Sequence, residues 1–240
     1  MAALFISDLH IDAHHWGVTE QFLSFLAADA RGADALYILG DLFDSWVGDD
    51  AADAAQTAAI AGLRALTSQG VPCFVMHGNR DFLLGAEFCR MSGAELLSDP
   101  LIVTLYGERV LVMHGDALCT DDRAYQRLRA TVRDPDWQRQ FLALSAASRS
   151  ALAGAARVGS QAHTAAVEYA IMDVNADSVA TALRNAGTAT LLHGHTHRPA
   201  IHALHVDGRP CRRIVLGDWY EQGSVVRWDE HGPELKSMAR

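Results

Sequence analysis

The chain is poor in the features that mark secreted, membrane-spanning or nucleic-acid-binding proteins. Its four cysteines form no CxxC pair, which favours reduced thiols in the core of a cytosolic protein over a disulfide framework. No apolar run approaches the roughly 18 to 20 residues of a membrane-spanning helix, and we expect no signal peptide. Lys and Arg number 20 against 29 Asp and Glu, a formal charge of −9. This balance argues against nucleic acid as a partner, because phosphate binding relies on clustered basic residues.

What is present is typical of one soluble globular domain. Half of the 240 residues are hydrophobic and a fifth are charged, enough to bury a large core. Short apolar runs alternate with helical patterns up to residue 113, and helices are predicted over 18–30 and 52–69. Later strands are predicted at 189–193, 200–206, 211–216 and 223–228, with Asp207-Gly208 as a hairpin turn. This alternation indicates an α/β fold, a sheet flanked by helices.

Between about Asp121 and Ala186 the pattern is helical only. One interpretation is a block of helices packed on the sheet. The other is a cap over a binding site, because segments inserted at strand ends tend to carry specificity. We favour the cap and predict a single domain over residues 1–240 with a helical cap inserted at about 121–170.

Five short segments place metal-ligand residue types directly after an apolar run. They are Asp8-Leu9-His10, Gly40-Asp41, His77-Gly78-Asn79-Arg80-Asp81, His114-Gly115 and His193-Gly194-His195-Thr196-His197. Such runs are typical of buried strands that end in loops, and open α/β sheets bind ligands beyond the strand ends. One Asp or His alone is usually structural, but five such segments predict a shared metal site. Imidazole, carboxylate and amide ligands without thiolate favour manganese, iron or zinc over magnesium or copper.

The order of these segments resembles the calcineurin-like metallophosphoesterase superfamily. The resemblance implies a four-layer α/β/β/α metallophosphoesterase sandwich with two bound cations. One metal would take Asp8, His10, Asp41 and His197, and the other Asp41, Asn79, His114 and His195. Asp41 would bridge the two, as a pair about 3.5–4 Å apart requires if it is to activate water and clamp a phosphoryl group. Asp44 and Asp81 are interpreted as residues that orient these ligands.

Arg80 stands where the superfamily usually has a histidine that is thought to protonate the leaving oxygen. An arginine stays charged and cannot act as a general acid, but it can bind a phosphate with paired donors. A phosphate monoester leaving group needs no proton, because its second pKa is about 6. Arg80 therefore favours cleavage of a pyrophosphate bond over a simple ester, unless it only supports its loop.

Longer motifs narrow the resemblance to the UDP-2,3-diacylglucosamine hydrolase family, over residues 4 to about 228. They run from Gly40 to Asp50, His77 to Gly85, Met113 to Asp122, Ile171 to Val174, His193 to Pro199 and Leu216 to Trp219. This resemblance implies an enzyme of lipid A biosynthesis that uses two Mn²⁺ ions per chain. Water would attack the α-phosphorus of UDP-2,3-diacylglucosamine and give UMP and 2,3-diacylglucosamine 1-phosphate (lipid X). The implied location is the cytoplasmic face of the bacterial inner membrane, as a peripheral protein.

The resemblance also implies the residues that act on the substrate. Catalysis is assigned to Asp41, Asn79, Arg80 and His195, and substrate contacts to Asn79, Arg80, Asp122, Ser160, Thr164, Val167 and His195. Thr164 replaces an Asn and keeps a hydrogen-bonding group. Val167 stands where some members have Lys and offers no polar contact, so the nearby Arg157 is our candidate for the missing charge.

The helical block carries seven arginines between residues 123 and 157 against only Asp134 and Asp136. Apolar residues such as Trp137 and Phe141 lie between them. The block could contact anionic lipid headgroups, or it could be an ordinary amphipathic cap with solvated arginines. We expect its apolar side chains to accommodate acyl chains, and we predict no obligate protein partner.

Three alternatives share part of this pattern. A metallophosphoesterase for a soluble nucleotide diester or polyphosphate would keep the metal site and differ in the cap. A non-catalytic scaffold would be expected to lose ligands, yet all seven ligand positions are filled. A nuclease would want a basic groove with stacking aromatics, which the acidic composition disfavours. The lipid-linked pyrophosphatase is our preferred hypothesis.

Overall fold

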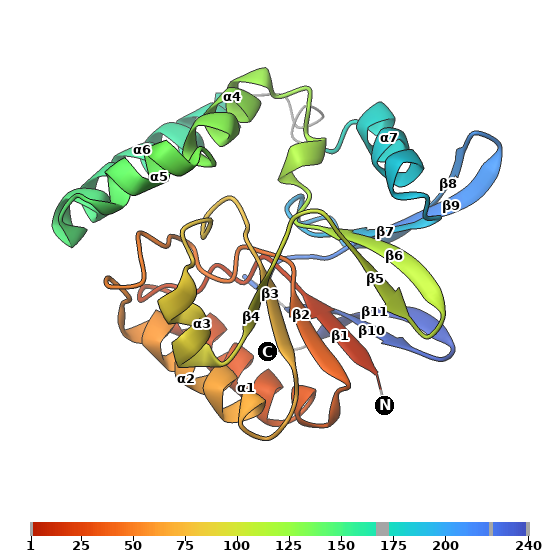
Figure 1. Ribbon diagram of the computed structural model, residues 1–240, viewed down its shortest axis with the longest axis horizontal. Coiled ribbons are helices and arrows are strands. Elements are labelled where there is room, and N and C mark those ends of the chain that lie inside the picture. The colour runs from red at the N-terminus through yellow and green to blue at the C-terminus, as the bar shows by residue number, and fades with distance from the viewer. Residues whose placement is uncertain (1, 167–172, 221–222, 239–240) are drawn as a thin grey trace.

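Two β-sheets packed face to face, with helices on their outer faces, form the body of the protein (Figure 1). The computed structural model describes residues 2–166, 173–220 and 223–238. The first sheet has the order β11-β10-β1-β2-β3-β4 and the second β5-β6-β7-β9-β8. The first sheet comprises β1 (Ala3–Ile6), β2 (Ala35–Ile38), β3 (Cys73–Met76), β4 (Glu95–Leu97), β10 (Gly223–Asp229) and β11 (Gly232–Met238). The second comprises β5 (Leu101–Leu105), β6 (Glu108–Met113), β7 (Thr190–His193), β8 (Ala200–Val206) and β9 (Arg209–Val215).

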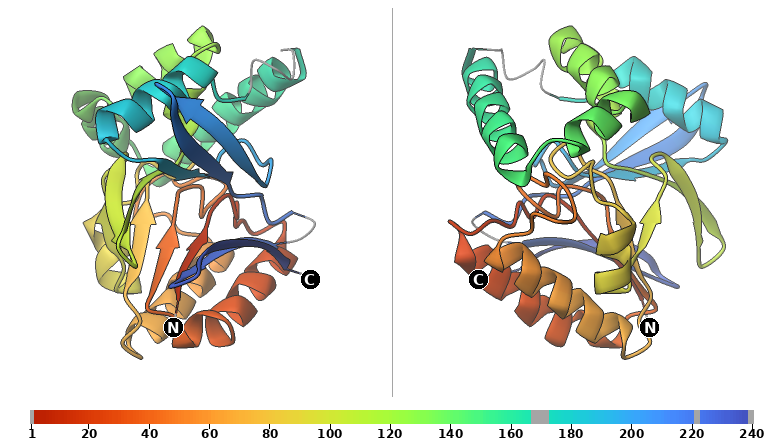
Figure 2. Two further views of the ribbon diagram at one scale, coloured as in Figure 1. Left: turned by 90° about the vertical axis from the view of Figure 1, so that its right-hand side faces the viewer. Right: turned by 60° about the vertical axis from the view of Figure 1, so that its left-hand side comes forward.

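Alternation along the strands divides the core into layers. In β1, Leu4 and Ile6 pack with the helices of the first sheet, and Phe5 points to the second sheet, because successive side chains of a strand face opposite ways. The helices are α1 (Trp16–Ala27), α2 (Ala54–Thr67), α3 (Ala86–Ser92), α4 (Arg123–Val132), α5 (Pro135–Leu142), α6 (Ala146–Ala166) and α7 (Ala176–Ala186). Helices α1 to α3 cover the first sheet and α7 covers the second, which confirms the four-layer α/β/β/α order (Figure 2).

Most predicted elements are present, with shifted ends. Helix α1 begins before residue 18 and ends at Ala27 rather than 30. Helix α2 begins at Ala54 because Asp53 caps it: its Oδ1 accepts from the Gln56 amide at 2.8 Å. Strand β11 was not predicted, because an edge strand with one paired neighbour needs no continuous apolar run.

The helical block from 121 to 186 divides into two parts with different packing. Val179 and Leu183 of α7 are buried against the second sheet, so this helix follows the sheet-packing interpretation. Helices α4 to α6, called the cap below, stand over the strand ends (Figures 1 and 2). Neither α4 nor α5 has a fully buried residue, because these helices enclose a cavity rather than a dry core.

Arg149 anchors the cap to the loop between β2 and α2. Its side chain is buried, with 2 % of the residue exposed, and it donates to the Val47 carbonyl at 2.7 Å and to Asp50 Oδ2 at 2.5 Å. Gly48 makes room for it: a Cβ there would lie 2.0 Å from the Arg149 Nη1 atom. The motif from Gly40 to Asp50 therefore has a structural use besides Asp41.

The four cysteines are free thiols, as predicted, and Cys73 and Cys119 are buried. Within the described ranges, no helix is both long and apolar enough to cross a bilayer.

Candidate metal centre

The loops that follow β1, β2, β3, β6 and β7 meet at one point between the two sheets. On one side, His10 Nε2 lies 3.2 Å from His197 Nε2, and His197 Nε2 lies 3.4 Å from Asp8 Oδ1. His10 Nε2 is also 3.8 Å from Asp41 Oδ2. These are the four residues predicted to share one cation.

The other predicted ligands surround Asn79. Its Oδ1 atom lies 3.0 Å from His114 Nε2 and 2.8 Å from His195 Nδ1. His114 Nε2 is 3.8 Å from Asp41 Oδ2. The same Asp41 oxygen therefore lies equally far from a histidine of each group, as a bridging ligand requires.

These distances fit cations held at ordinary bond lengths. Two ligands of one ion at about 2.1 Å each can be at most about 4.2 Å apart, and every distance above is shorter. Asp8, His10 and His197 form one compact group of possible ligand atoms, and Asp8, Asp41 and His114 another. The donors are oxygen and imidazole nitrogen, which suit manganese, iron or zinc.

The backbone of this centre is strained. Five of the seven non-glycine residues with positive φ among those described are predicted ligands: Asp8, His10, Asp41, His195 and His197, with φ between 51° and 65°. This conformation costs an L-residue roughly 1–2 kcal/mol, and such strain gathers at functional sites. The remaining two, Tyr106 and Asp207, occupy hairpin turns.

Glycines let the loops approach closely. A Cβ on Gly78 would lie 2.0 Å from Asp41 Oδ1, and one on Gly194 would lie 2.3 Å from Asp8 Oδ2. The glycine that precedes Asn79 and the one that precedes His195 are therefore spacers, required so that two carboxylates can enter the centre.

Burial sets the protonation of the ligands. It lowers the pKa of His10 and of His195 to about 3, so both imidazoles are neutral near pH 7 and offer lone pairs to a metal. Burial raises the pKa of Asp41, and the neighbouring carboxylates of Asp81 and Asp8 raise it further. A cation would offset this repulsion, which supports the fit of the centre to metal ions.

Residues behind the ligands hold them in place. Asp81 accepts hydrogen bonds from the backbone amides of Gly78, Asp41, Leu42 and Phe43 at 2.8 to 3.3 Å, as expected for an orienting residue. Asp44 behaves differently, because its carboxylate pairs with Arg157 of the cap rather than with a ligand. The orienting role of Asp44 therefore stays a prediction.

Asp218 orients a ligand and was missed by the sequence analysis. Its Oδ2 lies 3.2 Å from His197 Nδ1, the carboxylate–histidine arrangement common behind metal-binding imidazoles. Burial lowers the pKa of His197, but the hydrogen bonds to Asp218 and Asp8 outweigh it and raise this pKa to about 10. The sequence signal for Asp218 was its position in the motif from Leu216 to Trp219.

A second missed group connects the metal centre to the cap. Asp116 is buried, and its Oδ2 accepts from Tyr125 Oη at 2.6 Å and from Arg129 Nε at 2.7 Å. The Tyr125 ring lies 6.0 Å from the His195 ring. We call these three residues the Asp116 cluster. It places helix α4 directly against a predicted ligand.

A cavity of about 610 Å³ lies between the metal centre and the cap. Its inner end is polar, and its outer part is walled by apolar side chains of the cap and of the loops after β2 and β3. The polar lining includes Asp44, Asn79, Arg80, Asp116, Arg129, Arg133 and Arg157. The apolar lining includes Trp46, Val47, Phe82, Leu83, Leu128, Val132, Trp137, Phe141, Leu144 and Leu152. The shape suits an amphipathic ligand with an anionic head.

The predicted substrate contacts are placed unequally. Asn79, Arg80 and Arg157 line the cavity. Asp122 caps helix α4, because its Oδ1 accepts from the Tyr125 amide at 2.9 Å. The side chains of Ser160 and Thr164, and the whole of Val167, lie outside the described residues, so those three assignments stay predictions.

Most of the cap arginines, for which the sequence left open a membrane-facing or an ordinary solvated surface, have partners inside the protein. Arg129 binds Asp116, Arg133 donates to the Gly78 carbonyl at 2.9 Å, and Arg149 and Arg157 pair with Asp50 and Asp44. They therefore serve the cavity and the anchoring of the cap. A count of charge along the sequence cannot reveal which way each side chain points.

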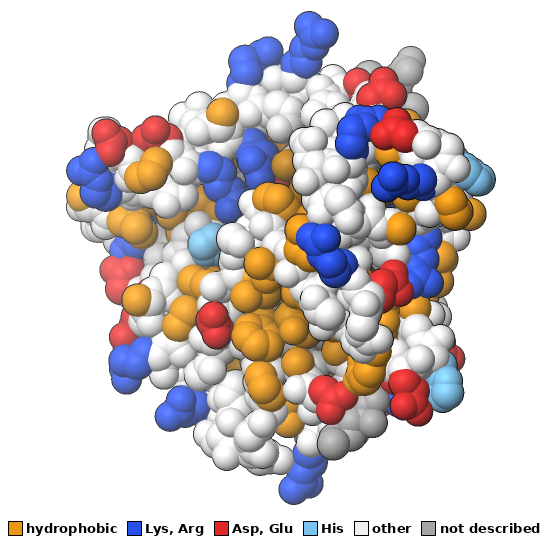
Figure 3. Space-filling view, turned by 45° about the vertical axis from the view of Figure 1, so that its right-hand side comes forward, with side chains coloured by type: hydrophobic (Ala, Val, Ile, Leu, Met, Phe, Trp, Pro, Cys, Tyr) orange, Lys and Arg blue, Asp and Glu red, His pale blue; other side chains and the backbone are white. Residues whose placement is uncertain are grey.

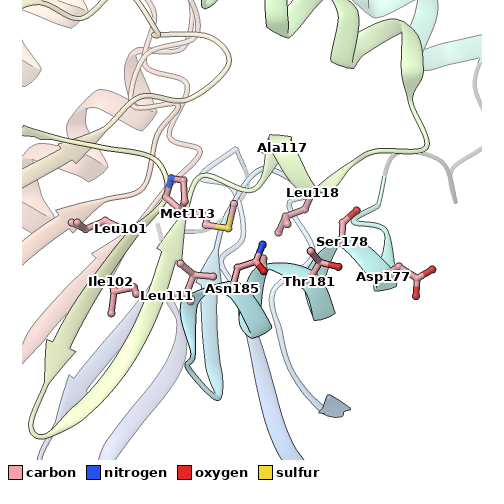
Figure 4. Close-up of a pocket in the computed structure, with 13 residues that line it drawn as sticks. Leu101, Ile102, Leu111, Met113, Ala117, Leu118, Asp177, Ser178, Thr181 and Asn185 are labelled. Carbon is pink, nitrogen blue, oxygen red and sulfur yellow. The ribbon is translucent and has the colours of Figure 1, made fainter. Parts of the chain in front are cut away.

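A second groove lies between β5, β6 and α7 (Figure 4). It measures about 810 Å³ and is lined by apolar residues such as Leu101, Leu111 and Met113, with Thr181 and Asn185 from α7. None of the predicted metal ligands lines it. Because this groove is larger than the cavity under the cap, size alone does not identify the functional cavity. Hydrophobic side chains also gather at the centre of the face in Figure 3, with acidic and basic side chains intermixed around them.

Known proteins are similar to this chain in sequence and in fold. The model of the calcineurin-like phosphoesterase family matches residues 1–199. Curated proteins named UDP-2,3-diacylglucosamine hydrolase are similar over 100% of both chains, at 49% identity in Stenotrophomonas maltophilia (strain K279a) and 50% in Xanthomonas oryzae pv. oryzae (strain PXO99A). A solved archaeal phosphodiesterase covers 100% of both chains with a TM-score of 0.50 at 10% identity, a likeness of fold alone.

Proposed function

Since this chain belongs to the calcineurin-like phosphoesterase family, and within it to the UDP-2,3-diacylglucosamine hydrolases, we propose that it hydrolyses UDP-2,3-diacylglucosamine. Water adds to the α-phosphorus and the pyrophosphate bond breaks, which gives UMP and 2,3-diacylglucosamine 1-phosphate. The observation that carries this proposal is one cavity whose inner end is polar and basic beside the metal centre and whose outer part is apolar.

We further propose that the centre holds two Mn²⁺ ions per chain, one on each side of Asp41. The ligand atoms on each side lie 2.8 to 3.8 Å apart, which supports this assignment. A pair of cations supplies a nucleophile from water at neutral pH and neutralises charge on the phosphoryl oxygens.

The side chains around the centre have separate tasks in this reaction. Asn79 and Arg80 face the cavity, and the Arg80 amide donates to Asp41 Oδ1 at 2.8 Å, which fixes the loop against the bridging carboxylate. The Arg80 guanidinium can bind the leaving phosphate with paired donors. Arg133 adds positive charge on the cap side, whereas Asp116 and Asp44 offset the charges of Arg129 and Arg157. Arg80 and Arg133 would therefore stabilise the dianionic product without a general acid.

The apolar part of the cavity is proposed to hold the two acyl chains. Leu128 and Leu152 line it and are still 54% and 52% exposed, so its outer part opens to the surface. Burying these chains is favourable by about 0.8 kcal/mol per methylene. This gain discriminates the diacyl substrate from soluble nucleotide diesters.

We propose that the protein binds the cytoplasmic face of the inner membrane as a peripheral protein. The exposed leucines at the cavity opening, together with Leu142 and Leu144, form the apolar contact. Arginines contribute less than their number suggests, since Arg129, Arg133, Arg149 and Arg157 have partners inside the protein. Binding should therefore depend on these leucines more than on anionic lipid.

The decisive experiment uses metal-stripped protein and UDP-2,3-diacylglucosamine in detergent micelles, with and without added Mn²⁺. Asp41→Asn serves as a control of nearly equal volume that weakens the bridge. Release of UMP and the diacyl sugar phosphate, dependent on Mn²⁺ and on Asp41, supports the proposal. If only a soluble phosphodiester is cleaved, the metal assignment stands and the substrate assignment fails.

A further inference from the structure

Tyr220 is an exposed aromatic residue beside His10 and His197, on the side of the metal centre where these two predicted ligands meet. Its ring is parallel to that of His10, with 5.5 Å between the centroids and 3° between the planes, and it lies 6.3 Å from the His197 ring. The residue is 40% exposed. It does not line the cavity under the cap.

The substrate has a lipid half and a nucleoside half, so it requires a second binding region at this centre. The proposal rests on the function given above, in which the scissile pyrophosphate lies at the metals. The acyl chains occupy the cap cavity, which is reached through Asn79 and Arg80. The nucleoside must then leave the centre in another direction, and His10 and His197 mark the side away from Asn79.

Tyr220 has the geometry and surroundings that a nucleobase needs. One face of its ring is parallel to the His10 ring, and 40% of the residue is exposed. Two predicted ligands lie within 6.3 Å of the ring, measured between centroids, so a base on Tyr220 would be close to a phosphate at the metal centre.

We propose that Tyr220 forms the nucleoside subsite by stacking on the base of the uridylyl group. Stacking on an aromatic ring is favourable for any base, because every base has a π-face. The interaction would hold the α-phosphorus near the residues proposed to bind the metals, while the cap holds the other half of the substrate. Tyr220 is then a substrate-binding residue, and its contact with His10 couples base binding to the metal centre.

The test compares two monoesters that share phosphate and ribose. Binding of UMP and of ribose 5-phosphate is measured by calorimetry on the Mn²⁺-saturated protein, and its manganese content is checked for each variant. UMP should bind at least about tenfold more tightly, and Tyr220→Ala should remove most of this ratio. Tyr220→Phe should retain it. Tyr106→Ala, at an exposed tyrosine in the β5–β6 turn, is the matched control and should leave the ratio unchanged.

The ratio of affinities distinguishes stacking from a role in metal retention. If Tyr220 only shields His10, its removal weakens both ligands equally and the proposal is wrong. The proposal is equally wrong if the native protein does not prefer UMP. Because calorimetry needs no turnover, failure to hydrolyse UDP-2,3-diacylglucosamine would refute the proposed function separately from the subsite.

Discussion

The Asp116 cluster should contribute a measurable coupling energy between the cap and the metal centre. Asp116 is fully buried, while 23% of the Arg129 side chain is exposed. Removing one partner of a buried ion pair costs about 3–5 kcal/mol, and the partial hydration of Arg129 places Asp116→Asn near the lower limit. We expect losses of about 3 kcal/mol for Asp116→Asn and about 4 kcal/mol for Arg129→Met, because the second change leaves a fully buried carboxylate without its cation. A charged hydrogen bond is worth about 1.5–3 kcal/mol. The loss in the double variant should therefore be smaller than the sum of the two single losses by about that amount.

A double-mutant cycle measures this coupling. Urea unfolding of the native protein, the two single variants and the double variant gives the four free energies of unfolding, with EDTA present so that metal binding does not contribute. Arg123→Met, at an exposed position of the same helix, controls for loss of an arginine. A coupling energy below about 0.5 kcal/mol would show that the 2.7 Å contact is not energetically significant and would refute this reasoning.

Four further outcomes are expected. Asp218→Asn should weaken manganese retention about 10- to 100-fold, because it removes the carboxylate behind His197; dialysis followed by metal analysis measures this. Arg149→Met should release the cap and lower kcat/KM for the diacyl substrate more than for bis(4-nitrophenyl) phosphate. Leu128→Glu places charge in the apolar wall and should raise KM for the diacyl substrate, again relative to the diester. Burial lowers the pKa of His193 to about 4, so without metal this residue makes unfolding easier as pH falls from about 6.5 towards 4; urea unfolding of His193→Gln should show a weaker pH dependence.

The sign of that pH dependence follows from proton binding. Between pH 4 and 6.5 the unfolded chain binds a proton at His193 and the folded chain does not. The free energy of unfolding therefore rises with pH in this window. His114 and His197 act in the opposite sense at higher pH, because their pKa values are raised to about 9 and about 10. Only the difference between native protein and variant isolates the contribution of His193.

The clustering of the predicted ligands could be inferred from the sequence, because each of these residues follows a strand. Each strand is a short apolar run with a clear end, and the parallel pairing of β1, β2 and β3 brings those ends to one edge. Ligand identity was then a matter of residue type. The sequence did not show the left-handed backbone at Asp8 and Asp41, because residue type does not predict this conformation for an individual aspartate.

The sequence predicted the helices of the cap, but it did not predict which partners the side chains of the cap contact. Its arginines look equivalent in the sequence, yet Arg129 reaches Asp116 and Arg149 reaches Asp50, each over a separation that no local pattern encodes. The pairing of Asp44 with Arg157 could not be predicted for the same reason, since Arg157 lies on the cap. Tertiary partners decide the role of a charged side chain, and spacing along the chain does not.

These long-range pairs link the position of the cap to the polar end of the cavity. Asp44, Asp50 and Asp116 all belong to loops that follow strands, and each holds a different arginine of the cap. Asp44 and Asp116 also lie in the wall of the cavity, so the cap position and the polar end of the cavity depend on the same carboxylates. The carboxylates that attach the cap at Arg157 and Arg129 therefore also line the space proposed for the phosphates, whereas the Arg149 anchor lies outside it.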